Sequence, residues 1–469
     1  MGSTFFGLNV ALSGLVTQQR ALNTVSQNLT NATTPGYSRQ RVEMAAQIPY
    51  AYPALNSPVG PGQIGTGVLA AAHVRLRDQF VDVRYRQQAA ATGQFEARSD
   101  AMRRIDTVID EPGETGITSL LERFWGSWQA LSLDPTSAAA REATRHAGQA
   151  LAQGFSDLRA QLVASQAEAD ARIGLQVARV NDLAGQVNQL NQEIAMVVAV
   201  GQEPNDLRDR RDLLLDELAG YADITVTETA ATGKVSVAIG SQLLVDSGTD
   251  AVNALAIDAA GAATVGGTPT TISGGSLRGL VDVRDAVIGG AGGYIAQLDA
   301  LAGAVAASVN ARHAAGFGLD GGTGRDFFTG ATAAAIAVSA PVMASVDAIA
   351  ASDTAAGLPG GADAAVAIAQ LQFLVQPIGA STTTLDGFYQ QMVARVGVDA
   401  DQANRMAAVQ RGVLEAAGSR RDAVSGVNID EELADMVRFQ KAYNSAARMI
   451  TTLDEMLETI VNRMGIVGR

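Results

Sequence analysis

Both ends of this chain carry a long amphipathic stripe with helical spacing, and this pairing limits the folds open to it. Near the N-terminus, leucines recur at spacings of four and three, with polar residues at two of the same heptad positions: Leu8, Leu12, Leu15, Gln19, Leu22, Ser26 and Leu29. The C-terminal segment repeats the pattern and, after a one-residue shift, continues it: Ile429, Leu433, Met436, Gln440, Tyr443, Ile450, Leu457 and Ile460. A lone amphipathic helix is marginal in water. We therefore expect the two end helices to form an antiparallel coiled-coil pair.

A pair of helices still leaves apolar surface on its flanks, and two destinations for this surface remain open. The stripes can dock on the chain's own domain, as many terminal helices do, or they can pack sideways against other copies of the chain. Polar Gln19, Ser26 and Gln440 weaken a tight dimeric coiled coil and suit a segment that stays soluble while unpaired. The pattern alone does not choose between these destinations.

Between the ends the sequence predicts a mainly α fold with an elongated helical bundle. Helical patterns cover 76–110, 117–133, 137–200 and 206–221, and they return over 277–312, 362–376 and 385–424. The stretch 137–200 far exceeds an average globular helix, which indicates a rod. Short β-like runs occupy 222–276 and predict a small inserted β-rich domain, whereas 331–352 is open to strand or loop.

These patterns predict three parts of the chain. Residues 1–45 and 425–469 form a terminal-helix inner domain, residues 46–221 and 277–424 form the helical rod, and residues 222–276 form the β-rich insert, which part of 317–360 also joins. A Gly/Pro-rich connector, 49–67, follows the first helix.

Composition excludes several classes of function. The chain has 48 acidic residues and 34 Lys and Arg residues. Its net charge of −14 disfavours nucleic acid and anionic membranes as partners. The chain has no cysteine, which excludes disulfides and thiolate metal sites, and its three histidines lie far apart in sequence. We expect no metal and no cofactor. No signal peptide pattern begins the chain, and polar residues or proline break the uncharged stretches 327–346 and 364–385, so we expect no membrane insertion.

Three motifs resemble sites of chemistry and have simpler interpretations. Gly60–Gly65 matches GxGxxG, but a Pro-rich connector precedes it, so we expect a turn. Asp206, Asp209, Asp212 and Asp216 alternate with arginines on one predicted helix, and we interpret them as solvated or intersubunit charge pairs, not as acid–base catalysts. Trp125 and Trp128 share a helical face and are expected in the core, with a partner-binding patch as the alternative.

Several segments resemble a known family. Residues 11–15, 26–32 and 34–39 (ALSGL, SQNLTNA and TPGYSR) resemble the N-terminal signature of flagellar rod, hook and hook-associated proteins, and 425–432 with 439–443 resemble their closing signature. Residues 124–135, 205–212 and 310–316 narrow the resemblance to the flagellar hook-associated protein 1 family. The resemblance spans nearly the whole chain, although the insert and the stretch after Phe328 look short beside larger members.

This resemblance implies a non-enzymatic structural protein at the junction between flagellar hook and filament. It implies a homo-oligomeric ring that contacts the hook protein and a second junction protein, export through the flagellar channel, an extracellular location, and a cytosolic export chaperone on the C-terminal helix. The stripes would form the assembly interface. A turn between inner and outer layers would comprise Asn31, Pro35, Gly36, Tyr37, Gly426, Asn428 and Glu431. Another axial flagellar protein, or a stalk-borne enzyme or adhesin, remains the alternative.

Overall fold

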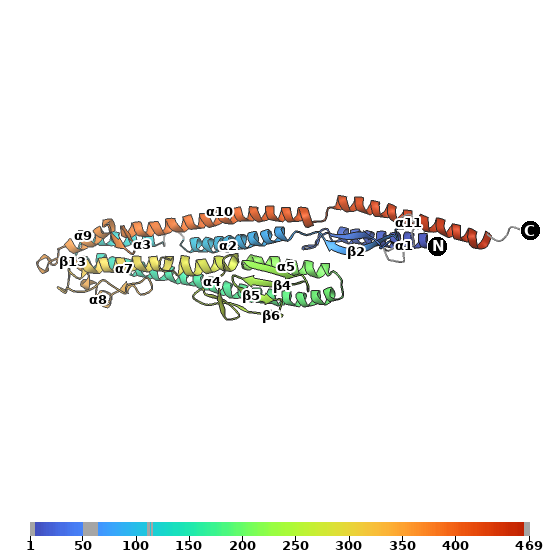
Figure 1. Ribbon diagram of the computed structural model, residues 1–469. Coiled ribbons are helices and arrows are strands. Elements are labelled where there is room, and N and C mark those ends of the chain that lie inside the picture. The colour runs from blue at the N-terminus through green and yellow to red at the C-terminus, as the bar shows by residue number, and fades with distance from the viewer. Residues whose placement is uncertain (1–4, 50–63, 110–112, 114–115, 464–469) are drawn as a thin grey trace, which may run out of the picture.

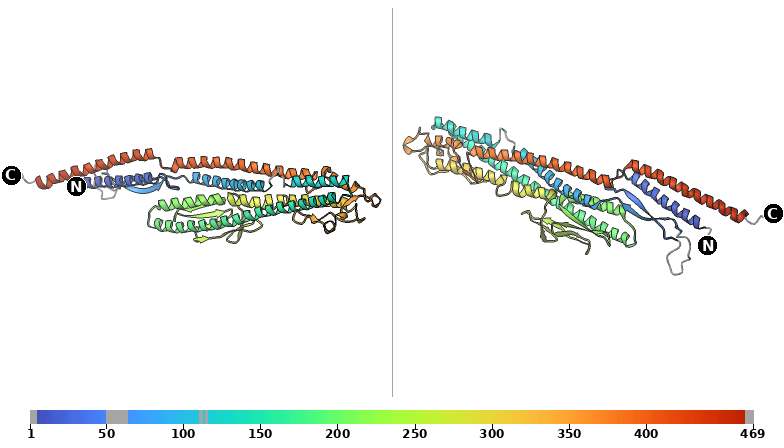
Figure 2. Two further views of the ribbon diagram at one scale, coloured as in Figure 1. Left: turned by 180° about the vertical axis from the view of Figure 1, so that it is seen from behind. Right: turned by 45° about the horizontal axis from the view of Figure 1, so that its top comes forward.

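The computed structural model describes residues 5–49, 64–109, 113 and 116–463, and it is a long, mainly helical molecule (Figure 1). Helices α1 (Phe6–Thr30) and α11 (Ile429–Arg463) lie side by side at one end, where both chain termini are found. The rest is a bundle built around α2 (Gln79–Ile109), α4 (Ala138–Ala199) and α10 (Leu385–Ser425). The two further views agree on this extended shape (Figure 2). The predicted rod with an antiparallel pair of end helices is confirmed.

The long helices lie close to where the sequence places them. Helix α3 spans Ile117–Leu133, α4 has 62 residues, and α5 spans Asn205–Tyr221. Ser137 begins α4 by accepting a hydrogen bond from the Ala140 N–H at 3.2 Å. The helical stretch expected over 277–312 is present in three pieces. They are α6 (Gly275–Asp282), a π-helical turn (Val283–Ile288) and α7 (Tyr294–His313), and a glycine-rich segment, 289–293, interrupts the stretch before α7.

The β-rich insert consists of two small antiparallel sheets. One has the order β3-β4-β5-β6 and the other β7-β8-β9; their strands are Ile224–Thr229, Lys234–Ile239, Gln242–Asp246, Ala251–Val252, Leu255–Ile257, Ala263–Val265 and Thr268–Thr270. Buried and half-buried residues alternate along β4, as expected for a strand with one covered face. Its buried side chains belong to one apolar cluster with α4, α5 and α6. The insert therefore shares its core with the rod.

The end of the rod far from the termini is covered by short elements from 317–383 (Figure 1). They are β10 (Phe317–Gly318), β11 (Phe328–Thr329), β12 (Ala337–Val338), α8 (Ala340–Ala344), η2 (Val346–Ala348), β13 (Ala350–Ser352), η3 (Ala355–Gly357), α9 (Asp363–Ala369), η4 (Gln370–Phe373), β14 (Gln376–Ile378) and β15 (Ser381–Thr383). Buried residues here, such as Phe328 and Ile336, belong to a different apolar cluster from the insert. The expectation that part of 317–360 joins the insert is wrong.

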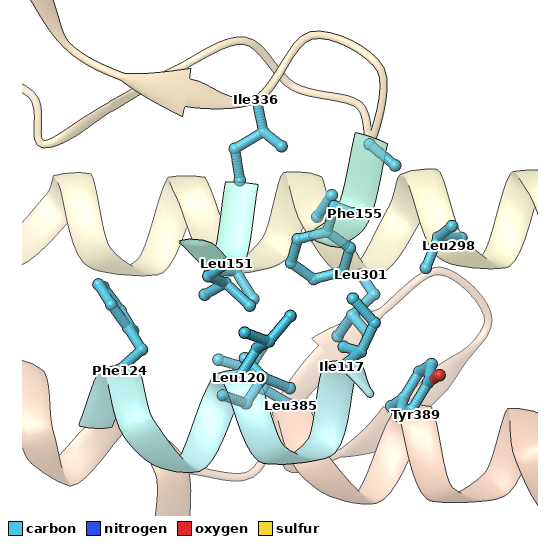
Figure 3. Packing of buried hydrophobic residues seen from close by; sticks show 14 of the residues in the cluster. Ile117, Leu120, Phe124, Leu151, Phe155, Leu298, Leu301, Ile336, Leu385 and Tyr389 are labelled. Atoms are coloured by element: carbon cyan, nitrogen blue, oxygen red, sulfur yellow. The ribbon is translucent and has the colours of Figure 1, made fainter. Parts of the chain in front are cut away.

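This outer cluster is a dense apolar core. Side chains from α3, α4, α7 and α10, including Leu120, Phe155, Leu301 and Leu385, converge in it (Figure 3). Trp125 and Trp128 are 1% and 0% exposed, and the Trp128 ring lies edge-on to Phe327 at 5.2 Å. The core interpretation of the tryptophan pair is confirmed.

A β-hairpin that the sequence does not reveal lies beside α1. Strand β1 (Gln40–Ala46) pairs with β2 (Val68–Arg75), and Ala46 is opposite Val68. The expected boundary between 45 and 46 therefore cuts β1. Alternation is weak here, because only Gln40 and Val42 of β1 are buried, and β2 contains three consecutive alanines, which are poor strand formers. Most of the expected connector, with the first four residues of the Gly60–Gly65 motif, lies outside the described residues.

The described residues bear on two features, membrane-spanning helices and metal-binding clusters. None of the helices they form is long and apolar enough to cross a membrane. Within the same part of the chain, no cluster of histidine and acidic residues is arranged to hold a metal ion.

Candidate assembly surface and its junction with the rod

Two glycines of α1 face α11 at close range. A Cβ placed on Gly7 would stand 3.4 Å from Leu453 Cδ1, and one on Gly14 would stand 4.0 Å from the Ala446 Cβ. Further along, Asn28 Nδ2 donates to Glu432 Oε2 at 3.0 Å. Higher residue numbers on α1 face lower residue numbers on α11, so the pair is antiparallel. The small residues at these points let the two backbones approach closely.

The hairpin covers a second face of α1. Ser13 Oγ accepts from the Val68 N–H at 3.2 Å, and Thr17 Oγ1 donates to the Val68 carbonyl at 3.4 Å. Asn28 Nδ2 also donates to the Gln40 carbonyl at 2.8 Å. Buried Thr17, Ala21, Thr24 and Asn28 recur at spacings of three and four, which places them on one side of the helix. This side packs on β1 and β2.

The predicted leucine stripe occupies the remaining face. None of its five leucines is fully buried, and Leu12 is 49% exposed. At 3.6 residues per turn, the stripe lies beside the positions that touch α11 and opposite those that touch the hairpin. Gly7 and Gly14, which face Leu453 and Ala446 of α11, lie beside this stripe, and the role of the stripe as an assembly interface stays a prediction.

The C-terminal stripe is arranged in the same way over most of its length. Ile429, Leu433 and Ile460 are 49%, 44% and 44% exposed, and the other members are half-buried: Met436, Tyr443, Ile450 and Leu457. Because the helices are antiparallel, the flanking stripes of α1 and α11 fall on the same side of the pair. We call this side the ridge: Leu8, Leu12, Leu15, Leu22 and Leu29 of α1, with Ile429, Leu433 and Tyr443 of α11.

Helix α11 also extends beyond α1. Since Leu453 is opposite Gly7, the turns of α11 that carry Met456 and Ile460 lie past the described start of α1 (Figure 1). Both side chains are exposed, Met456 to 57%. The isolated chain thus leaves one apolar flank and one apolar helix end open to solvent.

The expected junction turn after α1 packs against α5. Tyr37 Oη donates to Asn28 Oδ1 at 2.8 Å, and Asn31 Nδ2 donates to the Gln27 carbonyl at 3.0 Å. Gly36 has φ +79°, and a Cβ there would be 3.3 Å from the Leu213 Cβ, so both conformation and space favour glycine. Pro35 and Asn31 line, with this turn and α5, a cavity of about 210 Å³.

The return segment meets the same place. Gly426 ends α10, with its N–H donating to the Asp422 carbonyl at 2.7 Å, and Asn428 Oδ1 caps α11 by accepting from the Asp430 N–H at 3.0 Å. Arg39 binds both Glu431 and Glu432 at 2.6 Å. The predicted turn residues from the two chain ends therefore come together, and Arg39 with Asn28, which were not among them, join them.

Behind the turn lies a buried cluster of opposite charges, the junction cluster: Asp209, Asp212 and Asp216 of α5 with Arg75, Arg77, Arg86 and Arg421. Arg75 Nη1 is 2.8 Å from carboxylate oxygens of both Asp209 and Asp212. Asp216 is 2.8 Å from Arg86 and 2.5 Å from Arg421. The cluster thereby joins β2, α2, α5 and α10.

The solvated or intersubunit interpretation of these aspartates is wrong. Asp209 and Asp212 are only 6% and 9% exposed, and their partners are arginines of other elements in the same chain. Spacings of three and four put the three carboxylates on the face of α5 that packs inward. Neighbouring Arg211 is also buried and donates to the Gly233 carbonyl at 2.6 Å.

Electrostatics keep Asp212 ionised. Burial alone would raise the pKa of Asp212, but Arg77, Arg75 and Arg86 outweigh it and hold that pKa at about 2. Burial opposes the charge of Arg77, yet Asp212 and Asp82 raise its pKa. Burial, followed by Asp206 and Asp209, raises the pKa of Tyr37. Asp212 held in this state fastens elements together and does not exchange its proton near neutral pH.

Sequence reasoning missed the hairpin's share of this junction. Ser38 donates from both its N–H and its Oγ to Asp209, at 3.0 and 2.7 Å, and Asn205 Nδ2 donates to the His73 carbonyl at 2.9 Å. A usable signal was present: Arg75 and Arg77 are two residues apart where a strand ends, so their side chains share one side. It needed knowledge of the strand.

Segments of the chain match known protein families. Family models match three parts of the chain: the flagellar hook-associated protein FlgK helical domain over 102–328, the flagella basal body rod protein over 8–37, and the C-terminal model of basal body rod FlgEFG proteins over 421–464. The central match covers most of the rod and the insert, and the outer two cover the paired end helices.

Curated relatives point to the same family. The chain is 34% identical over 508 aligned residues to flagellar hook-associated protein 1 of Bacillus subtilis, covering 100% of both chains. It is 30% identical to the protein of that name from Salmonella typhimurium, over 69% of this chain and 59% of that protein. The Escherichia coli protein of that name is 24% identical over 97% of this chain and 99% of its own.

A solved structure shares the fold. The flagellar hook junction protein FlgK from Burkholderia pseudomallei superposes with a TM-score of 0.64, at 16% identity, over 73% of this chain and 100% of that one. At this identity the match supports the architecture alone. The paired end helices, the rod and the full-length identity to the Bacillus subtilis protein together show that this chain belongs to the flagellar hook-associated protein 1 family.

Proposed function

We propose that this chain is a structural component of the bacterial flagellum that joins the hook to the filament. The observation that carries the proposal is the contrast between a finished rod and an unfinished terminal-helix unit, by which we mean α1, α11, β1 and β2. The ridge leaves Leu12 and Leu433 about half exposed, which is costly for an isolated protein and useful for one that packs against copies of itself.

The same observation supports a mechanical role. The rod holds the terminal-helix unit through Arg39 with its two glutamates and through the junction cluster, in addition to the connecting chain segments. Several charge-assisted hydrogen bonds across one junction resist bending at that point. A protein that connects two tubes of different stiffness needs such a fixed angle between its inner and outer parts.

The proposed partners are those that membership of the family implies. Copies of this chain would form a ring in the flagellar axis, with the terminal-helix units inside and the rods outside. The hook protein would contact the ring on one side and a second junction protein on the other. The chain would leave the cell through the flagellar export channel, and a cytosolic chaperone would cover α11, whose end carries exposed Met456 and Ile460.

No catalytic role is proposed. The junction cluster is filled with arginine–carboxylate pairs, and its arginines hold Asp212 ionised. General acid–base catalysis needs a group whose pKa lies near the working pH. The cluster fits a structural role better than a chemical one.

A deletion strain tests the function. Cells that lack this chain should keep their hooks but shed filament protein into the medium, and should swim again when the wild-type chain is supplied. Normal filaments on the deletion strain would refute the junction role. Loss of the hooks themselves would point to another axial position.

A further inference from the structure

One peptide group near the outer end of the rod is held between two basic side chains. It joins Ile349 to Ala350, the first residue of β13. Its carbonyl accepts from Arg141 Nη1 at 2.6 Å, and its N–H donates to His313 Nε2 at 3.0 Å. Both side chains are buried, with Arg141 0% and His313 1% exposed. We call Arg141, His313 and this peptide group the peptide clamp.

The hydrogen bonds of His313 specify its protonation state. Nδ1 lies 2.6 Å from the Arg325 carbonyl, which can only accept, so Nδ1 carries the proton. Nε2 then has a free lone pair and accepts from the Ala350 N–H. A second proton, on Nε2, would set two N–H donors against each other and break the bond to Ala350.

Arg141 makes the same place unfavourable for a further positive charge. Its guanidinium donates to main-chain carbonyls, among them that of Pro135 at 2.8 Å, and its Nη2 has no hydrogen-bond partner among the described residues. Burial lowers its pKa, and Asp347 and Asp320 act on it as charges without a hydrogen bond. A second buried cation close to this arginine would be costly.

The other groups that face His313 divide in their effect. Burial lowers the pKa of His313 to about 4, and the cations of Arg325 and Arg141 act in the same direction. The Arg325 carbonyl and the Asp326 carboxylate oppose them. Helix α3 adds the uncharged ring of Trp128, edge-on at 6.2 Å. The folded chain therefore keeps this ring neutral where a free imidazole takes up a proton.

We propose that the peptide clamp opens in mild acid: a proton taken up by His313 releases β13 from the outer end of the rod, while the junction with the terminal-helix unit holds. Strand β13 has three residues, and β10, its partner in a two-stranded sheet, has two, so few other hydrogen bonds retain it. The junction cluster is less sensitive to acid, since the pKa of Asp212 is held at about 2.

The direction of the effect follows from the two states of the clamp. In the closed clamp, His313 stays neutral down to about pH 4, whereas in an open segment it is protonated below about pH 6.5. Each pH unit between these limits therefore favours the open form roughly tenfold. Above about pH 6.5 the closed form has its full stability.

Thiol labelling tests the clamp in the full chain, which has no cysteine of its own. Ala351→Cys puts a thiol on β13 where the native side chain is 1% exposed, and Ala302→Cys puts one on α7, at 0%, in the same apolar cluster. A pyridyl disulfide, which reacts with thiols in acid as well as at neutral pH, should label neither at pH 7. At about pH 4.5, Ala351→Cys should react at least tenfold faster than Ala302→Cys.

Histidine variants identify the sensor. With His313→Gln, which cannot titrate, the ratio of the two labelling rates should no longer change with pH. His146→Gln is the matched control, because that side chain is 66% exposed, and it should keep the wild-type response. Equal acceleration at both cysteines would mean that acid unfolds the whole rod. A response that survives His313→Gln, or no acceleration at Ala351→Cys, would equally overturn the inference.

Nuclear magnetic resonance of the wild-type chain gives a second readout that does not depend on how a variant folds. With nitrogen-15-labelled histidine, one of the three imidazoles should be neutral with its proton on Nδ1, and should remain so at about pH 5.5, below the ordinary pKa of histidine. Its signal should be missing from the His313→Gln spectrum. A proton on Nε2, or a charged ring at that pH, would contradict the clamp.

Discussion

The outer end of the rod buries its large apolar side chains, whereas the terminal-helix unit leaves several of them exposed. In the outer core, Phe124, Trp128 and Phe327 are 0% exposed and meet as neighbouring rings. In the terminal-helix unit, Leu12 and Leu433 remain nearly half exposed although the helices that carry them are fully formed. One region is completed by its own chain, and the other leaves a face for a neighbour.

This difference teaches how one sequence can specify both a stable monomeric body and an assembly surface. The rod buries large side chains and gains the hydrophobic stabilisation that folding requires. The α1–α11 pair brings Gly7 against Leu453 and Gly14 against Ala446, and it leaves Leu12 and Leu433 nearly half exposed. Apolar area that stays exposed adds nothing to folding, so the pair gains stability when a neighbour covers that flank.

The largest expected effect is on assembly. Leu15→Asp places a charge on the ridge, where a neighbour would have to desolvate it, so incorporation at the hook should be abolished. The rod should unfold at its usual temperature, because Leu15 lies outside both apolar cores. Electron microscopy of flagella and calorimetry of the purified chain check the two parts. Normal incorporation would mean that the ridge is not an interface.

The next effect is on the outer core. Trp128→Ala removes a fully buried ring packed against Phe124 and Phe327 and should destabilise the rod by about 3–5 kcal/mol. Denaturant unfolding followed by circular dichroism measures it, with Leu133→Ala, an 85% exposed site of α3, as the neutral control. Equal effects of the two substitutions would contradict the assigned core.

The junction cluster should respond to loss of one charge. Asp212→Asn removes the carboxylate that pairs with Arg75, Arg77 and Arg86, and it should destabilise the chain by about 3 kcal/mol. Because the pKa of Asp212 is lowered to about 2, its contribution in the wild type is present above about pH 4 and is lost as pH falls toward 2. Urea unfolding at pH 7 and pH 3 should show the two chains converge. Asp401→Asn, an exposed pair with Arg405, is the control.

The smallest effect is a pH dependence of the outer core. His313 is 1% exposed, its Nδ1 lies 2.6 Å from the Arg325 carbonyl and its Nε2 accepts from the Ala350 N–H, and burial lowers its pKa to about 4. The unfolded chain takes up this proton below about pH 6.5 and the folded chain does not, so stability should fall by about 1 kcal/mol per pH unit between pH 6 and 4.

Variants separate this histidine from the other titrating groups. Unfolding free energies measured in urea at several pH values should show a shallower slope for His313→Gln than for the wild type. His146, whose side chain is 66% exposed, provides the control, and His146→Gln should keep the wild-type slope. An unchanged slope in His313→Gln would contradict the buried neutral state.

The sequence predicted those parts of the fold that local periodicity determines. Helices α3, α4 and α5 begin and end within a residue of the expected positions, since long apolar repeats and caps such as Ser137 specify them locally. It did not reveal β1 and β2, whose few buried residues give no alternation, or the break at 283–293, where only glycines mark the boundary. Both depend on contacts with distant segments.

The position of the stripes and of the turn could be predicted from the sequence, whereas their role in assembly stays a prediction. The stripes and the turn at Gly36 and Tyr37 were found, because spacing and turn chemistry are visible in one sequence. The approach of Gly7 and Gly14 to α11 was not, since glycine has no side chain and adds nothing to an apolar pattern. Nor were the arginine partners of Asp209 and Asp212, because they come from segments more than a hundred residues away.

Hydrogen exchange of backbone amides tests the central claim most directly, because it compares the two regions in one molecule. In the isolated chain, the amides of α1 and α11 should exchange within seconds to minutes while those of α3, α4 and α7 stay protected for hours. In flagella that contain the assembled chain, both sets should be protected, since neighbours cover the ridge. Strong protection of α1 and α11 in the isolated chain would show that the terminal-helix unit is complete without a neighbour, and would contradict the account.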